Sequence, residues 1–93
     1  MEYSKEVIDL VWEMAFEIEG KDPSIYRKDK CGATIRKDLL NTTNTYGWII
    51  NHIHPISCGG IEFFTNYQPL HWKNHESKGE GPDFPHVYCV WNK

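Results

Sequence analysis

GWIINHIHPISCGGIEFFTNYQPLHWKNHESKGE, residues 47–80, contains the clearest signals for strands, turns and a helix in the chain. Within it, WIINHI is a β-branched run suited to a buried strand, which Pro55 ends because proline lacks a backbone donor. The irregular PISCGG is followed by NYQPL, a short extended segment that Pro69 confines to a sheet edge. HWKNHESKG has the length of two helical turns and ends in a glycine. The stretch therefore predicts a strand, a long loop, a second strand and a short helix.

Before this stretch, apolar residues recur at the spacing of an amphipathic helix. They are Val7, Ile8, Val11, Trp12, Ala15 and Ile18. With Ser4 as the N-cap and Gly20 as the stop, the pattern predicts a helix over residues 4–19. CGATI, residues 31–35, is a candidate short strand, and NTTNTYG, residues 41–47, is a polar loop. Helices and strands in this order indicate an α+β fold.

Length and composition limit the class of protein. A chain of 93 residues predicts one domain over residues 1–93, and 40% hydrophobic with 14% aromatic residues excludes a disordered chain. The three cysteines, Cys31, Cys58 and Cys89, build neither a complete disulfide framework nor a Cys-x-x-Cys zinc clip, which favours a reducing compartment. Residues 1–20 have no basic n-region and carry acids among the apolar positions, so we expect neither a signal peptide nor a membrane span. The expected location is the cytoplasm.

Charge is unevenly distributed along the chain. The net charge is −3, which argues weakly against non-specific binding of polyanions. Residues 1–20 hold six acids against Lys5, whereas residues 26–37 hold five bases against Asp29. The overall charge can therefore hide a basic face, although an ordinary solvated loop explains the same residues.

Two histidines lie where a strand end and a helix can face each other. His52 comes at the end of the predicted strand, where its side chain projects toward a cleft, and Asn51 beside it offers a carbonyl oxygen. Neighbours on a strand point to opposite faces, so both reach one site only if the strand ends or twists there. The short helix supplies His75, with Lys78 one turn later. Such a pair of elements can hold a divalent ion and leave coordination positions open.

The motifs NHIHPISCGG and TNYQPLHWKNHESKGE closely resemble the HNH endonuclease motif of the ββα-metal superfamily. Its usual form is Asp-His-Ile-x-Pro-x-Ser-x-Gly-Gly, then Asn-Leu-Gln-x-Leu, then Asn or His followed two residues later by Lys-Gly. The resemblance covers residues 47–80 directly, and VWEMA, YRKDKCGATI and YGW look like the flanks of small bacterial and phage members. His52, Asn66 and His75 stand in the order and at the separations of that motif.

The resemblance implies a DNA endonuclease with a ββα-metal motif over residues 47–80. His52 matches the general base, and Asn66 matches the asparagine whose amide ties the loop and holds the base strand. Asn51 and His75 match the protein ligands of one divalent cation, and the paired glycines match the turn that folds the loop back. Family members generally leave a 5′ phosphate and a 3′ hydroxyl.

The chain departs from the family at the metal site. Most relatives have Asp where this chain has Asn51, so Mg²⁺ should bind less well, and Mn²⁺, Ni²⁺, Co²⁺ or Zn²⁺ become plausible beside it. Bacteriocin relatives have a further histidine where this chain has Gly79. Many relatives also carry paired Cys-x-x-Cys clips, and here His71 and Asn74 stand around the last motif, so we expect no structural zinc.

The remaining candidates have two interpretations each. His54 can tune the site or be an exposed polar residue, and His71 can orient the site or cap the helix. Candidate phosphate contacts, which supply affinity without sequence information, are Lys78, Lys73, Arg27, Lys28, Lys30, Arg36 and Lys37.

Three functions remain open at this point. The leading one is a metal-dependent DNA endonuclease, with a homodimer or a larger phage or bacterial assembly as a possible form. The second is a nucleic-acid-binding module that has lost cleavage, which Asn51 makes credible. The third is a protein-interaction or inhibitor protein on the same scaffold, compatible with the acidic N-terminal helix.

Overall fold

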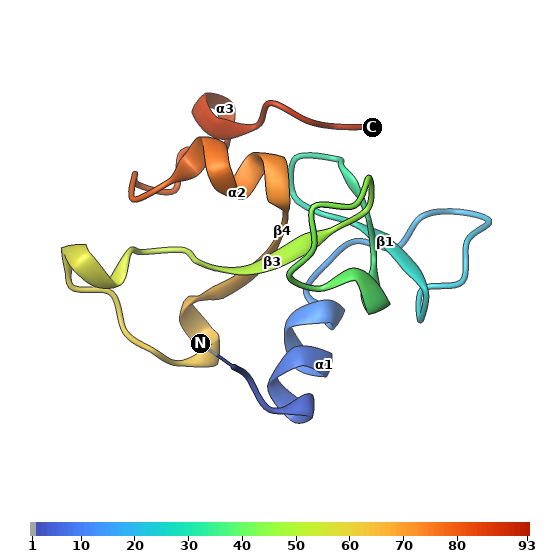
Figure 1. Cartoon of the computed structure of the whole chain (residues 1–93), viewed down its shortest axis with the longest axis horizontal. Coiled ribbons are helices and arrows are strands. Elements are labelled where there is room, and N and C mark those ends of the chain that lie inside the picture. Colours follow the sequence, from blue (N-terminus) through green and yellow to red (C-terminus); the bar gives the residue numbers. More distant parts are fainter. Residues whose placement is uncertain (1) are drawn as a thin grey trace.

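The computed structural model describes residues 2–93 and has the mixed α+β fold that the sequence predicts. Its elements are α1 (Lys5–Glu13), β1 (Tyr26–Lys28), β2 (Thr34–Arg36), β3 (Trp48–His52), β4 (Tyr67–His71), α2 (Trp72–Lys78) and α3 (Pro85–Tyr88). In Figure 1, α1 lies on one side of the β3–β4 sheet, and α2 and α3 lie on the other. Among residues 2–93, none of the helices has the length and hydrophobicity of a membrane span.

The β3–β4 hairpin positions the residues of the central stretch. The two strands are antiparallel, with His52 opposite Tyr67, Asn51 opposite Gln68, and Trp48 opposite His71. The strand, loop, strand and helix predicted for residues 47–80 are all present in that order. The loop that joins β3 to β4 extends away from the rest of the molecule (Figure 1).

Helix α1 is shorter than predicted. Ser4 caps it as expected, since its Oγ accepts from the backbone N–H of Val7 at 3.2 Å. The helix ends at Glu13 rather than at residue 19, because Phe16 pairs with Lys28 through two backbone hydrogen bonds of 2.9 Å. The chain after Glu13 is therefore extended rather than helical, because Phe16 pairs with the end of β1.

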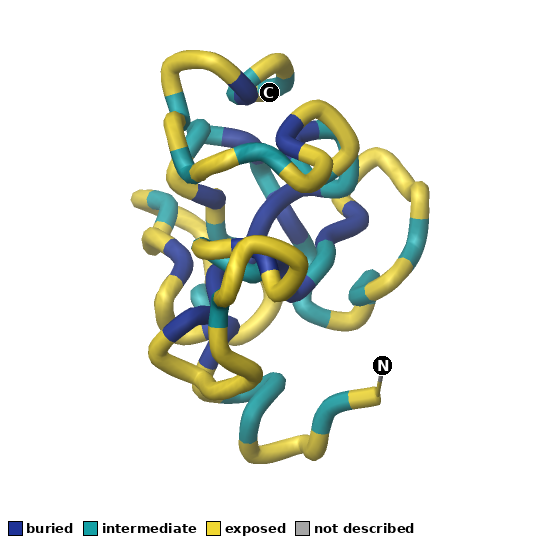
Figure 2. Tube along the Cα trace, turned by 90° about the vertical axis from the view of Figure 1, so that its left-hand side faces the viewer, coloured by how far each residue is buried: buried dark blue, intermediate teal, exposed yellow. Residues whose placement is uncertain are grey.

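The hydrophobic core lies between α1 and the two sheets. Its buried members are Val11, Trp12, Ala15, Ile35, Trp48, Ile50 and Tyr67. The rings of Trp12 and Trp48 pack with their centroids 5.3 Å apart. In Figure 2 the buried part of the trace runs through the middle of the molecule, with exposed loops around it. Burial of each large side chain contributes about 1.5 to 3 kcal/mol, so this cluster holds α1 against β3.

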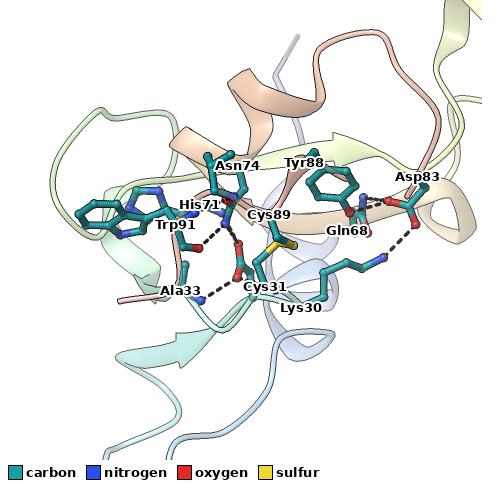
Figure 3. Close-up of a disulfide and its surroundings, with 12 residues drawn as sticks. Lys30, Cys31, Ala33, Gln68, His71, Asn74, Asp83, Tyr88, Cys89 and Trp91 are labelled. Carbon is teal, nitrogen blue, oxygen red and sulfur yellow. Dashed lines mark hydrogen bonds and ion pairs between the residues drawn. A yellow bond between two sulfur atoms is a disulfide. The ribbon is translucent and has the colours of Figure 1, made fainter. Parts of the chain in front are cut away.

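A disulfide joins Cys31 to Cys89, across 58 residues of sequence (Figure 3). Cys58 is exposed and free. The number and spacing of the three cysteines favour a reducing compartment, yet two of them are paired in the structure. Separation along the chain says nothing about distance once the fold brings the Cα atoms of these residues to 5.3 Å.

A buried polar cluster fixes the C-terminal segment beside the disulfide. Asp29 is 1% exposed, and its Oδ2 accepts from the backbone N–H of His71 at 2.9 Å and from Asn74 Nδ2 at 3.1 Å. Asn74 Oδ1 in turn accepts from the backbone N–H groups of Val90 and Trp91, both at 2.9 Å. Because buried polar groups must be hydrogen-bonded, this cluster holds the start of α2 and the C-terminal segment in one arrangement.

Candidate functional site

A cleft of about 240 Å³ opens where β3 ends and α2 passes over it. It is lined by Asn51, His52, Pro55, Ile56, Ser57, His75, Lys78, Gly79 and Glu80. The structure thus brings together the predicted base, His52, and the predicted ligand pair, Asn51 and His75. Neighbouring residues of a strand share this cleft because His52 is the last residue of β3, as the sequence argument required.

His52 is held by a carboxylate from the long loop. Its Nε2 lies 2.7 Å from Oε2 of Glu62. Partial burial opposes ionisation of Glu62, but hydrogen bonds from Tyr67 and His52 outweigh it and lower the pKa of Glu62. An ionised carboxylate only accepts, so Nε2 of His52 donates and Nδ1 is the nitrogen left to take a proton.

Glu62 is a residue that the sequence argument missed. It stands two residues after the paired glycines, in the loop that folds back toward the end of the strand. Its position in this loop is the one sequence signal that an acid could reach His52.

Asn66 closes the loop that carries Glu62. Its Oδ1 accepts from the backbone N–H of His54 at 2.8 Å, and its Nδ2 donates to the carbonyls of His54 and Ile61, both at 2.9 Å. All three bonds go to backbone groups on the two sides of the loop. This is the tying role that the resemblance implies for Asn66, and the side chain lies outside the lining of the cleft.

The paired glycines make the tight return of the loop possible. Gly59 has a φ of 91°, which side chains rarely adopt, and a Cβ on Gly60 would lie 1.9 Å from the carbonyl oxygen of His54. His54 itself is exposed, with its Nε2 2.9 Å from the carbonyl oxygen of Cys58. Its side chain therefore braces the loop and does not line the cleft.

Asn51 and His75 are in direct contact across the cleft. Asn51 Nδ2 lies 3.0 Å from His75 Nδ1, and Asn51 Oδ1 accepts from Gln68 Nε2 at 2.9 Å. Burial lowers the pKa of His75, and the nearby charge of Lys78 lowers it further. A neutral imidazole results, which accepts the amide N–H of Asn51.

Lys78 is a buried residue of the cleft that links α2 to β3. It is 6% exposed, and its Nζ donates to the backbone carbonyl of His52 at 2.9 Å. Burial lowers its pKa, despite the opposing effect of nearby carboxylates. The ammonium thus joins the end of α2 to the end of β3. On the outer side, Ser57 Oγ donates to Glu80 Oε2 at 2.8 Å and bridges loop and helix.

His71 lies at the far end of the hairpin, away from the cleft. Its Nδ1 accepts from the backbone N–H of Lys73 at 3.1 Å, and its Nε2 donates to the carbonyl of Thr45 at 2.7 Å. The residue is fully buried, and burial lowers its pKa. Of the two interpretations left open, the structure supports the helix cap.

Of the seven predicted phosphate contacts, Lys78 lines the cleft and the other six do not. Three of them form ion pairs: Lys30 with Asp83 at 2.9 Å, Arg36 with Asp38 at 2.8 Å, and Lys37 with Asp9 at 2.7 Å. Arg27 donates to backbone carbonyls of Ala15 and Pro23, and Lys73 Nζ lies 3.6 Å from the ring centre of Trp91. Lys28 is exposed.

Within residues 2–93 there is no group of three or more His, Cys, Asp or Glu side chains that could hold a metal ion. The candidate pair of Asn51 and His75 is smaller and includes an amide. Comparisons of the chain with models of protein families, with curated proteins and with solved structures found no match.

Proposed function

We propose that this protein is a metal-dependent DNA endonuclease that hydrolyses phosphodiester bonds in the cleft at the end of β3. The observation that carries the proposal is the 2.7 Å contact of Glu62 with His52, which lines the same cleft as Asn51 and His75. A histidine oriented by a carboxylate beside two potential metal ligands is an arrangement suited to activating water.

The chain's own residues would act as follows. Glu62 orients the imidazole, and Nδ1 of His52 takes a proton from a water molecule. The water oxygen then forms a bond to phosphorus as the bond from phosphorus to the 3′ oxygen breaks. The 3′ oxygen takes a proton from solvent, and His52 returns its proton to solvent. The products are a 5′ phosphate and a 3′ hydroxyl, the pair that the resemblance implies.

Asn51 and His75 are the residues that would hold a divalent cation. When bound, the ion would supply positive charge beside the phosphate as negative charge builds on its oxygens. One amide oxygen and one imidazole nitrogen fit such an ion in kind, and they favour Mn²⁺, Ni²⁺, Co²⁺ or Zn²⁺ over Mg²⁺, which prefers carboxylates.

A second candidate function is a nucleic-acid-binding module without cleavage. It is favoured by the direction of the Asn51 side chain, whose Nδ2, not its oxygen, faces Nδ1 of His75. Ligation by both residues requires this amide to turn. A chain in which it never turns would keep the cleft but lack the ion.

Cleavage of supercoiled plasmid DNA with Mg²⁺, Mn²⁺, Ni²⁺ or Zn²⁺, and with a chelator, separates the two candidates. We expect the parent to nick DNA with at least one ion, and His52→Ala to be slower by about 10² to 10⁴ while binding DNA equally. DNA retention without cleavage in any ion would support the binding module. A His52→Ala variant that cuts at the parent's rate would remove His52 from the chemistry.

A further inference from the structure

Asp83, in the segment before α3, accepts three hydrogen bonds. Its Oδ1 accepts from Tyr88 Oη at 2.6 Å and from Gln68 Nε2 at 3.0 Å, and its Oδ2 accepts from Lys30 Nζ at 2.9 Å (Figure 3). A carboxylate paired with an ammonium can only accept. The Gln68 side chain must therefore present its nitrogen, not its oxygen, to Asp83.

The orientation of the Gln68 amide, set by Asp83, in turn sets the orientation of Asn51 in the cleft. Gln68 stands opposite Asn51 in the hairpin, and the same Nε2 donates to Asn51 Oδ1 at 2.9 Å. With its oxygen held there, Asn51 turns its Nδ2 toward His75 Nδ1 at 3.0 Å. That nitrogen of His75 must accept, so a neutral His75 carries its proton on Nε2.

The unpaired oxygen of Gln68 shows how strongly the orientation of its amide is fixed. Gln68 is 5% exposed, and its Oε1 has no hydrogen-bond partner among residues 2–93. Buried polar atoms are rarely left so. Reversing the amide would place Oε1 against two acceptors, the oxygens of Asp83 and Asn51, and lose both bonds. The acceptor at Asp83 therefore fixes Gln68 even though one of its atoms stays without a partner.

We propose that Asp83 is a positioning residue for the Asn51–His75 pair. Through Gln68 it directs the Asn51 amide nitrogen to His75 and places the His75 proton on Nε2. A cation reaches Nδ1 of His75 only when the Asn51 amide turns against Gln68. The proposal rests on the proposed function only in naming what the pair would bind, because the order of donors and acceptors is independent of cleavage.

The test exchanges the donor at residue 68 with the acceptor at residue 83. In the double variant Gln68→Glu/Asp83→Asn, residue 68 can only accept, and the net charge is unchanged. Asn51 should then turn its nitrogen to residue 68 and its oxygen to His75. Nitrogen-15 NMR of the imidazole at alkaline pH should show the His75 proton on Nε2 in the parent and on Nδ1 in the double variant.

Lys30→Met is the matched control. It removes the ion pair at Asp83 but leaves the acceptor for Gln68, so stability should fall while the His75 proton stays on Nε2. The double variant should also bind Mn²⁺ about tenfold more tightly in calorimetry, the equivalent of about one hydrogen bond that no longer has to break.

A parent His75 with its proton on Nδ1 would overturn the proposal without any variant, and so would a folded double variant that keeps the proton on Nε2. If the double variant does not fold, the spectra of the parent and Lys30→Met still decide. A change of tautomer with no Mn²⁺ binding in either protein would support the positioning role of Asp83 and count against the proposed function.

Discussion

At the scale of single residues, Asn66 is the clearest case of a side chain that acts by holding others. Its three bonds to the backbone of His54 and Ile61 fix the loop that carries Glu62. Asn66→Ala should lower the melting temperature and the cleavage rate together, with a loss of about 1 to 3 kcal/mol in unfolding free energy. Calorimetry and plasmid cleavage measure both. An inactive variant that melts like the parent would instead place Asn66 in the chemistry.

Glu62 should affect the rate without affecting the fold. Glu62→Ala frees the His52 ring, and a misplaced catalytic group typically costs about 10²-fold in rate. Glu62→Gln should retain much more activity, because its amide oxygen can still accept from Nε2 of His52. Single-turnover cleavage compares the two variants at equal DNA occupancy. Equal losses in both would show that the charge of Glu62, rather than its hold on the ring, is what matters.

Residue identities predicted some of this site and not the rest. The sequence predicts roles for His52, Asn51 and His75 because each stands in a short recognisable motif. The fold brings all three to one cleft. Glu62, Gln68 and Asp83 were given no role. Each matters through contacts made across the fold, and no spacing along the chain encodes which acceptor a buried amide will face.

At the scale of elements, the disulfide fastens the turn between β1 and β2 to the C-terminal segment (Figure 3). In the chain-entropy account, a bridge across 58 residues stabilises the fold by about 4 kcal/mol. Cys31→Ser/Cys89→Ser should therefore melt well below the parent in denaturant and thermal scans. Cys58→Ser, at the exposed free cysteine, is the control and should melt like the parent. An unchanged midpoint in the double variant would show that the pair contributes nothing.

The cap of α2 should make stability depend on pH. Burial lowers the pKa of His71 below its ordinary value of about 6.5, so in mild acid the unfolded chain binds a proton that the native His71 does not. Stability should fall as the pH drops below about 6.5, and less so in His71→Asn, which can still cap Lys73. His75 contributes equally to both proteins. Parallel curves for parent and variant, from urea titrations between about pH 7 and pH 5, would contradict this account.

Element order was more predictable than element length. The strand, loop, strand and helix of residues 47–80 follow from local patterns of β-branched residues, proline and glycine, and all four are present. The end of α1 was not predictable, because it depends on the pairing of Phe16 with Lys28, a tertiary contact. The same holds for the pairing of Cys31 with Cys89.

At the scale of the whole molecule, β3 lies between two packed layers. The core holds α1 beneath β3, and the Asp29–Asn74 cluster holds α2 and the C-terminal segment above it. The end of β3 therefore has little freedom to move, and Lys78 fastens it to α2. This packing fixes the backbone that carries Asn51 and His52 opposite His75, so that only the Asn51 amide has to turn for the pair to bind an ion.

Whether Asn51 and His75 hold a cation can be measured by calorimetric titration of Mn²⁺ into the parent, Asn51→Asp and His75→Ala. In Asn51→Asp a carboxylate oxygen faces Nδ1 of His75, where two acceptors repel each other unless a cation or a proton lies between them. The account predicts one site in the parent, tighter binding in Asn51→Asp, and none in His75→Ala. Equal affinities in all three proteins would contradict it, because no ion would then be held by this pair.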